Sequence, residues 1–382
     1  ALNVITGGRM VSCMDEVKCG HHPFVIWKSS GIYGKEVLEI PGLIHGDPNK
    51  EVRKVAVCMT MSELSIELAG ATGVDAIVAH HPIVFGGLKR FTGGDYVQRA
   101  VMKAIKNDIA IYACHTNLDN VLRSGVNERI AKQLGFAVSG VLRPAAALLM
   151  KLAVYVPNEH ADHVRDALFA AGAGSIGNYD ECAFSTPGLG TFRPNALANP
   201  TLGVSGVREM VQEQRVEVLV PIWLKAQVGR AMVAAHPYEE VAHDWIALDN
   251  VSSEYGAGVL CKLPKPMSQL DFLQLIKREM DVDVVKFTRC DVREVNTVAI
   301  CGGAGSFLIG DAMRAGADAF ITSDVKYHEF FDAEEKLLLC DIGHYESEKY
   351  TIDLFSDILS SKFPKFATIF AETITNPIDY LT

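Results

Sequence analysis

Six side chains that suit metal binding are grouped in three short motifs of the sequence. Two adjacent histidines follow one apolar run, and two His-x-x-x-acid motifs follow others; the six residues are His80, His81, His115, Asp119, His344 and Glu348. Imidazole nitrogens and carboxylate oxygens together suit Zn, Mn, Fe or Co, and a carboxylate can bridge two ions. One ion does not require so many ligands, so the sequence predicts a two-metal site.

Each motif taken alone also has an ordinary structural explanation. Adjacent histidines are usually incidental, and a second pair, His21-His22, has no strand before it and is interpreted as surface loop. Asp119 by itself is typical of a turn or a helix cap. His344 and Glu348 have the spacing of a plain helical pair. The metal hypothesis therefore depends on a fold that brings the motifs together.

Strands that alternate with helices are predicted around these motifs. The predicted strands are Val55–Met59, Asp75–Ala79 and Ile109–Cys114, and the helices between them are Ser62–Ala71 and Tyr96–Asn107. This alternation is typical of βαβ units and a mostly parallel sheet. Ligands collect beyond the carboxyl ends of the strands in such sheets, so the motifs are predicted to meet in one cleft.

An internal repeat predicts a second unit of the same kind. Val55–Cys58 resembles Val298–Cys301, and Gly73–Val78 resembles Gly316–Ile321. Both matches have one offset, because 298 − 55 and 316 − 73 each give 243. A gap-free match across two strands and their connection indicates two related α/β halves that pack together.

The two His-x-x-x-acid motifs also correspond, at a different offset. His115–Asp119 and His344–Glu348 are related by 344 − 115 = 229. A metal cluster needs outer partners and a general base as well as ligands, so His115 is assigned a supporting or catalytic base role. Asp324 and His328 are candidates for outer partners on the same reasoning. Gly302–Ser306 is interpreted as a tight turn, with phosphate binding as the alternative.

The middle of the chain is predicted to be a separate ferredoxin-like module. Its predicted β-α-β-β-α-β elements are Leu149–Val156, Ala161–Ala171, Glu181–Ser185, Val216–Val220, Lys225–Ala235 and Ala242–Leu248, with a long loop at Pro187–Gly206. The predicted division has three parts. Residues 1–145 and 251–382 are the two halves of a metal-binding α/β domain, and residues 146–250 are the insertion.

The overall composition argues against several other classes of protein. Lys and Arg total 36 against 46 Asp and Glu, without a dense basic stripe, so nucleic-acid binding is not expected. The nine cysteines include no CxxC pair and are interpreted as reduced. Apolar stretches are too short to span a bilayer, and the N-terminus has no signal-peptide pattern, so a cytoplasmic protein without membrane contact is expected.

Longer segments around the motifs are distinctive enough to compare with known families. They are Ala79–Phe85, His115–Asp119, Cys301–Ser306, Lys326–His328 and Asp341–Glu348. They resemble the signature of the Nif-three-like family, whose members often carry the label GTP cyclohydrolase I type 2. The match extends from about Asp47 to the C-terminus, but only Gly42-Leu43 and Gly46-Asp47 match the family's opening Trp-Asp-Asn-x-Gly-Leu-like stretch.

The resemblance implies a dinuclear metal site, a toroidal homohexamer and an inserted domain similar to the PII/CutA type. By motif position its ligands carry over onto His80, His81, Asp119, His344 and Glu348, which selects Asp119 rather than His115 from the first His-x-x-x-acid motif. Two function hypotheses follow. One is a metal-dependent hydrolase that acts on a small nucleotide-like substrate, as the family label implies; the other is a non-enzymatic metal- or metabolite-binding regulatory scaffold.

Overall fold

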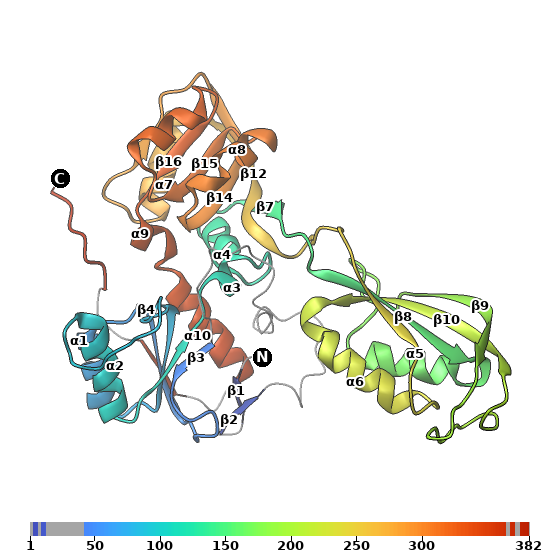
Figure 1. Ribbon diagram of the computed structural model, residues 1–382. Coiled ribbons are helices and arrows are strands. Elements are labelled where there is room, and N and C mark those ends of the chain that lie inside the picture. Colours follow the sequence, from blue (N-terminus) through green and yellow to red (C-terminus); the bar gives the residue numbers. More distant parts are fainter. Residues whose placement is uncertain (1–2, 7–8, 13–41, 364–366, 371–374, 382) are drawn as a thin grey trace.

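The structure, a computed structural model, describes residues 3–6, 9–12, 42–363, 367–370 and 375–381. The His21-His22 pair, predicted to be surface loop, and Cys13 and Cys19 lie outside these residues. Strands β1 (Asn3–Thr6) and β2 (Arg9–Ser12) form an antiparallel pair. The rest of the described chain forms three sheets with their helices, and Figure 1 shows them as three separate bodies.

The first body is a five-stranded α/β sheet. Its elements are β3 (Gly42–His45), β4 (Lys54–Thr60), α1 (Glu63–Ala71), β5 (Ala76–His81), α2 (Tyr96–Lys106), β6 (Ala110–Ala113) and β17 (Ala367–Phe370). The strand order is β17-β4-β5-β6-β3, parallel except for β3. Strands β4, β5 and β6 are almost wholly buried, as parallel strands covered on both faces require. The side chains of Ser62 and Asp95 cap α1 and α2.

The second body is a six-stranded sheet. Its elements are α4 (Val126–Gln133), β7 (Ala137–Pro144), β12 (Gly256–Ser268), α7 (Gln269–Glu279), β13 (Lys286–Phe287), β14 (Glu294–Ala304), η4 (Ser306–Leu308), α8 (Ile309–Arg314), β15 (Ala319–Ser323), η5 (Tyr327–Ala333) and β16 (Leu338–Asp341). The order is β13-β16-β15-β14-β12-β7. Only β14, β15 and β16 are parallel, so the expectation of mostly parallel sheets holds for the centre of this sheet and not for its edges.

The two α/β bodies exchange segments. Strand β7 precedes the middle module in the chain, yet it pairs with β12 in the second sheet. Helix α10 (Thr351–Lys362) and strand β17 come from the C-terminal part, yet they pack on or pair with β4 of the first sheet. A single apolar core runs through both bodies and contains Val57, Phe136, Phe272, Val298 and Phe355. Their relative position is therefore fixed by packing on both sides.

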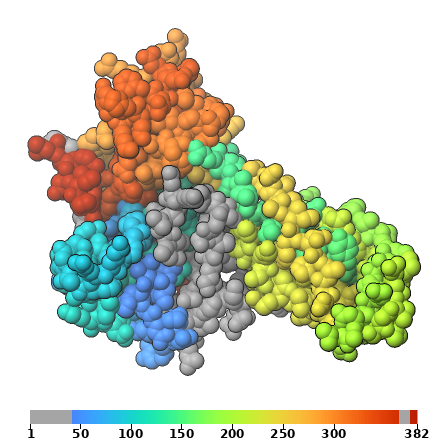
Figure 2. Space-filling model, viewed as in Figure 1, coloured from blue at the N-terminus to red at the C-terminus, as the bar shows by residue number. Residues whose placement is uncertain are grey.

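The middle segment forms the third body and projects away from the other two (Figures 1 and 2). Its elements are β8 (Leu149–Pro157), η2 (Asn158–His160), α5 (Ala161–Ala170), β9 (Ala183–Phe192), β10 (Glu209–Pro221), η3 (Ile222–Leu224), α6 (Lys225–Ala235) and β11 (His243–Ala247). The sheet order is β11-β8-β10-β9, antiparallel throughout. The predicted loop begins too early, because Pro187 lies within β9. This strand is at the edge of the sheet, where proline is tolerated.

Two short helices follow strands of the two α/β bodies. Helix α3 (Thr116–Asp119) comes after β6, and α9 (His344–Glu348) comes after β16. Both therefore start just beyond the carboxyl end of a parallel strand. Within the described residues, no helix has the length and apolar character that crossing a membrane requires.

Candidate metal centre

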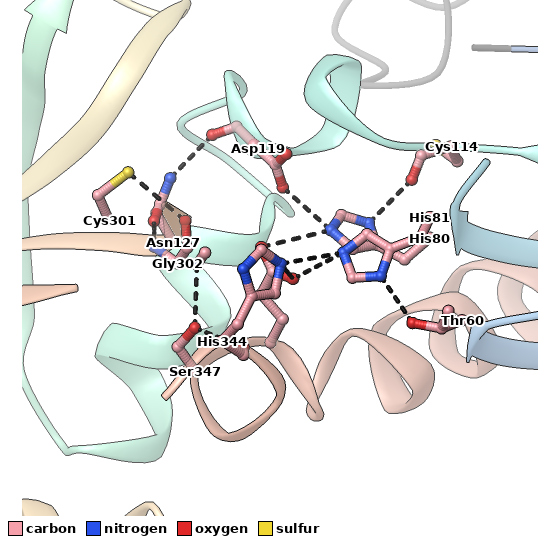
Figure 3. A network of polar contacts seen from close by, with 12 residues as sticks. Thr60, His80, His81, Cys114, Asp119, Asn127, Cys301, Gly302, His344 and Ser347 are labelled. Carbon is pink, nitrogen blue, oxygen red and sulfur yellow. Dashed lines mark hydrogen bonds and ion pairs between the residues drawn. The ribbon is translucent and has the colours of Figure 1, made fainter. Parts of the chain in front are cut away.

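The predicted ligands follow three different strands, and Figure 3 shows the side chains of His80, His81, Asp119 and His344 pointing toward one another. His80 and His81 are the last two residues of β5. His115 directly precedes α3 and Asp119 is its last residue, and His344 and Glu348 are the first and last residues of α9. The structure thus brings together residues that are far apart in the sequence, at the place where the strand–helix alternation predicts a cleft.

Glu348 is the residue around which the histidines gather. Its Oε2 lies 3.1 Å from the Nε2 atoms of both His81 and His344, and its Oε1 lies 3.7 Å from His80 Nε2. The side chain is only 3% exposed. Burial alone would raise the pKa of Glu348, but the histidines outweigh it and hold the pKa well below its ordinary value. The carboxylate is therefore kept ionised and turned toward three imidazole rings.

The side chains form two groups of possible ligands that share Glu348. One group is His81, His344 and Glu348, and the other is His80, Asp119 and Glu348; within each group the ligand atoms lie within 4.8 Å of one another. His80, His81 and His115 form a third such group. A shared carboxylate between two nitrogen–oxygen ligand sets is the arrangement in which two ions can be bridged.

His80 gives a direct test of whether the residues fit a metal ion. Its Nε2 is enclosed and has no hydrogen-bond partner among the described residues, with Asp119 Oδ1 at 3.5 Å. Burial alone would lower the pKa of His80. The charges of Asp119 and Glu348 outweigh burial and raise the pKa to about 9. Without an ion, a buried nitrogen is left without a hydrogen bond between two carboxylates, which costs free energy. The donor atoms and their burial therefore fit a cation.

The other ring nitrogen of each candidate ligand is fixed by a separate partner. His80 Nδ1 lies 2.9 Å from the carbonyl oxygen of Cys114, and His81 Nδ1 lies 2.7 Å from Thr60 Oγ1. His344 Nδ1 lies 2.7 Å from Asp324 Oδ2. With Nδ1–H donating to these oxygens, each Nε2 presents its lone pair to the cluster, as metal-binding histidines require.

Asp324 has a place in this arrangement that the sequence analysis anticipated. It adopts a left-handed backbone conformation with φ of 55°, which is unfavourable for most residues but tolerated by Asp. The pKa of His344 is raised to about 9, mainly by Glu348 and to a smaller extent by the Asp324 carboxylate. His328, proposed with it as an outer partner, instead has its ring against Tyr327 within the described part of the chain.

The ring of His115 lies beside the rings of the two adjacent histidines. Its ring centroid is 5.2 Å from those of both His80 and His81. It also lines the cavity in front of the cluster. A proton acceptor for a reaction in the cavity would occupy such a position.

Gly302 and Gly303, predicted to start a tight turn, are instead among the last residues of β14, where they support the cluster and form no open phosphate cradle. Gly302 N–H donates to Asn127 Oδ1, and Gly303 N–H donates to Ser347 Oγ. These donors are therefore already engaged. Gly303 has φ of 65°, and a Cβ there would clash with Glu348 Oε1. The absence of a side chain at this position lets the buried carboxylate approach the backbone of β14.

A cavity of about 470 Å³ opens in front of the cluster. His81, His115, Asp119, His344 and Glu348 lie in its wall together with apolar and neutral polar side chains. This volume is within the usual range for small-molecule sites. Thr60 and Cys114 are the functional partners that the sequence analysis missed, because a threonine and a backbone carbonyl carry no distinctive pattern.

Fold and site together define an α/β protein with a candidate metal centre between two interlocked bodies. Residues 33–377 match the model of the Duf34/NIF3 (NGG1p interacting factor 3) family. The chain belongs to this family, which confirms the resemblance found in the sequence.

Relatives and solved structures agree with this assignment. A GTP cyclohydrolase 1 type 2 homolog of Bacillus subtilis (strain 168) is 40% identical over 347 residues, which are 89% of this chain and 92% of the relative. A protein of the same description from Mycobacterium leprae is 33% identical over 84% of each chain. The crystal structure of a Bacillus cereus protein related to NIF3 superposes with a TM-score of 0.76 at 36% identity, covering 92% of this chain and 96% of that one.

Proposed function

We propose that the protein is a hydrolase that depends on two divalent metal ions and acts on a small nucleotide-like substrate. The observation that carries the proposal is the sharing of Glu348 by two ligand groups at the base of one cavity. The ligands in this proposal are His80, His81, Asp119, His344 and Glu348, and the candidate ions are Zn, Fe, Mn or Co. The descriptions of the relatives, GTP cyclohydrolase 1 type 2 homologs, support the substrate class.

Different residues of the chain have different roles in such a reaction. A pair of divalent ions, when bound, supplies Lewis acidity and lowers the pKa of a water molecule. His115, at the cavity wall beside His80 and His81, accepts the proton that the attacking water releases. Asp324 keeps His344 in place, and the Cys114 carbonyl does the same for His80. The rings therefore need little rearrangement when the substrate binds.

The proposal includes the architecture around the site. We assign residues 1–145 and 251–382 to two related halves. Strands β4 and β5 pair as Val55↔Ala76, and β14 and β15 pair as Val298↔Ala319. The two registers are the same after the offset of 298 − 55 = 243. We assign residues 146–250 to an inserted ferredoxin-like domain of the PII/CutA type, which the strand order β11-β8-β10-β9 supports. Assembly as a toroidal homohexamer in the cytoplasm completes the proposal.

One observation favours a regulatory scaffold as the second candidate function. The middle domain points away from the metal centre and contributes no residue to the described lining of the cavity (Figure 1). A domain of that size without a part in the chemistry is suited to docking a partner or sensing a metabolite. A tight small-molecule ligand that is bound without turnover would favour this function over the hydrolase.

The hydrolase is tested with metal-loaded protein against a panel of nucleotides that includes GTP. We expect release of a hydrolysis product by the wild type and loss of that activity in His81→Ala, which removes one ligand of the first group. His160→Ala, on the middle domain, is the control and should be as active as the wild type. Equal rates for wild type and His81→Ala would overturn the proposal.

A further inference from the structure

The cavity in front of the candidate metal centre is lined by two phenylalanines that remain half exposed. Phe85 follows β5 of the first body and is 52% exposed, and Phe307 lies in η4 of the second body and is 56% exposed. Both line the cavity that contains the candidate ligands. Each body therefore contributes one aromatic ring to the wall of the same small space.

Both rings are held by neighbouring groups. The Phe85 ring is 6.2 Å from the ring of His115, in an edge-to-face arrangement. The guanidinium of Arg143 lies 5.1 Å from the centre of the Phe307 ring, and its Nη2 donates to the Phe307 carbonyl oxygen at 2.7 Å. Arg143 is itself paired with Asp311. Fixed rings lose little conformational freedom when a ligand binds against them.

The cavity wall also contains neutral polar groups with no partner in the described chain. Thr116 and Asn120 line the cavity, and neither side chain forms a hydrogen bond to another described residue. Asn127 differs, because its amide donates to the Asp119 carbonyl and accepts from Gly302 N–H. The amide of Asn120 is thus free to present one donor group and one acceptor to a ligand.

An exposed phenylalanine alone would mean little, since many proteins have them. Phe91 is an example: it is 53% exposed and is not among the residues that line the cavity. Phe85 and Phe307 differ because they border a concave space of about 470 Å³ whose base holds charged groups. A space of this size accommodates a small molecule, whereas a protein partner requires a broad surface.

We propose that Phe85, Phe307 and Asn120 form a subsite for a planar heteroaromatic ring with hydrogen-bond donors and acceptors on its edge. The rings provide faces for stacking, which tolerates different bases, and the amide of Asn120 pairs with the edge. This inference rests on the proposed function and extends it, since it assigns the residues that hold the base of the nucleotide-like substrate.

The test measures binding rather than turnover, so that it can fail separately from the hydrolase proposal. Guanosine, adenosine and cytidine are titrated calorimetrically into metal-loaded protein, with ribose as the probe that lacks a ring. We expect at least one nucleoside to bind and ribose not to bind. Phe85→Ala and Phe307→Ala should each weaken nucleoside binding by about tenfold or more. Phe91→Ala, matched in exposure, should bind as the wild type does.

Two further variants protect the test against a folding defect. Phe85→Leu and Phe307→Leu retain most of the apolar volume and should keep the wild-type metal content. Their nucleoside affinity should nevertheless fall as much as that of the alanine variants. Asn120→Ala should weaken the binding of nucleosides. It should leave unchanged the binding of benzene-type rings, which have no hydrogen-bond donors or acceptors on their edge. Absence of nucleoside binding to the wild type, or equal affinity in the wild type and the phenylalanine variants, would overturn the subsite, whether or not the protein hydrolyses nucleotides.

Discussion

The carboxyl ends of β5 and β15 occupy matching positions in the two α/β bodies but carry different side chains. The frameworks agree in detail: Asp75 Oδ2 accepts from the backbone N–H groups of Arg53 and Lys54, and Asp318 Oδ2 accepts from those of Asn296 and Thr297. The offset is 243 in each case, since 318 − 75 and 296 − 53 both give it. The same offset places His80-His81 opposite Ser323-Asp324.

In the proposed repeat, the two strand ends have different roles. The first strand end presents two imidazoles directly to the cluster. The second strand end presents a wholly buried Ser323 and an Asp324 that acts through another residue, by holding His344. The candidate ligands of the second body come instead from α9, after the next strand. One body thus places ligands on the strand, and the other uses the same position to orient a ligand on a helix.

The largest effect is expected for Glu348, where the contributions of the two bodies meet. Glu348→Ala removes the carboxylate that both ligand groups share, so the metal content should fall from two ions per chain to fewer than one. Elemental analysis after dialysis measures this directly. Glu346→Gln is the control, because Glu346 is also buried on α9 but pairs with Asn376. Full metal content in Glu348→Ala would refute the shared carboxylate.

Removal of the metal should loosen the connection between the two bodies. An ion that binds only the folded state stabilises it by about 2.7 kcal/mol when its concentration is 100 times its Kd. A chelator should therefore lower the Tm of the wild type by several degrees, and added Zn²⁺ or Mn²⁺ should restore it. In His80→Ala the restored part should be much smaller. An unchanged Tm on chelation would mean that the cluster contributes nothing through a bound ion.

Asp324 tests the position that differs between the two strand ends. Asp324→Asn keeps the shape and tolerates the left-handed backbone, but it removes the charge that orients His344. Loss of such an outer partner typically weakens metal affinity by about 10- to 100-fold. The matched control is Asp108→Asn, since Asp108 has φ of 53° and pairs with Lys50 in the first body. Competition with a chromogenic chelator measures both, and equal affinities would remove Asp324 from the site.

The smallest effect on the metal site is expected for the hydrogen bonds that the two bodies have in common. Asp75→Ala and Asp318→Ala each remove two backbone hydrogen bonds to a partly buried carboxylate. A hydrogen bond that is partly exposed contributes about 0.5–1.5 kcal/mol, so the loss of two should lower the free energy of unfolding of each variant by about 1–3 kcal/mol. Urea denaturation should give similar losses for the two. A loss confined to one of them would break the equivalence of the two bodies.

The sequence predicts the local parts of this arrangement well, for physical reasons. The apolar run before His80 marks a buried strand, and the repeat of Gly73–Val78 at Gly316–Ile321 marks its counterpart. Strand pairing between distant segments leaves no such pattern. The crossing of β7 into the second sheet and of β17 into the first was therefore not predicted.

The same limit applies within the candidate site. The candidate ligand histidines can be recognised from residue type and spacing, and Asp324 from its offset of 243 from His81. The partners that orient His80 and His81 are a backbone carbonyl and a threonine hydroxyl, which occur everywhere in a sequence. His328 is predicted to be an outer partner because a metal cluster needs such groups, and its ring lies against that of Tyr327.

The central claim is that His80, His81, Asp119, His344 and Glu348 hold two metal ions. Anomalous diffraction from crystals of the metal-loaded protein tests it most directly. We expect two peaks per chain in front of Glu348, separated by about 3.5–4 Å as in other two-metal sites. A single peak at this position, or peaks only at other places on the chain, would contradict the claim.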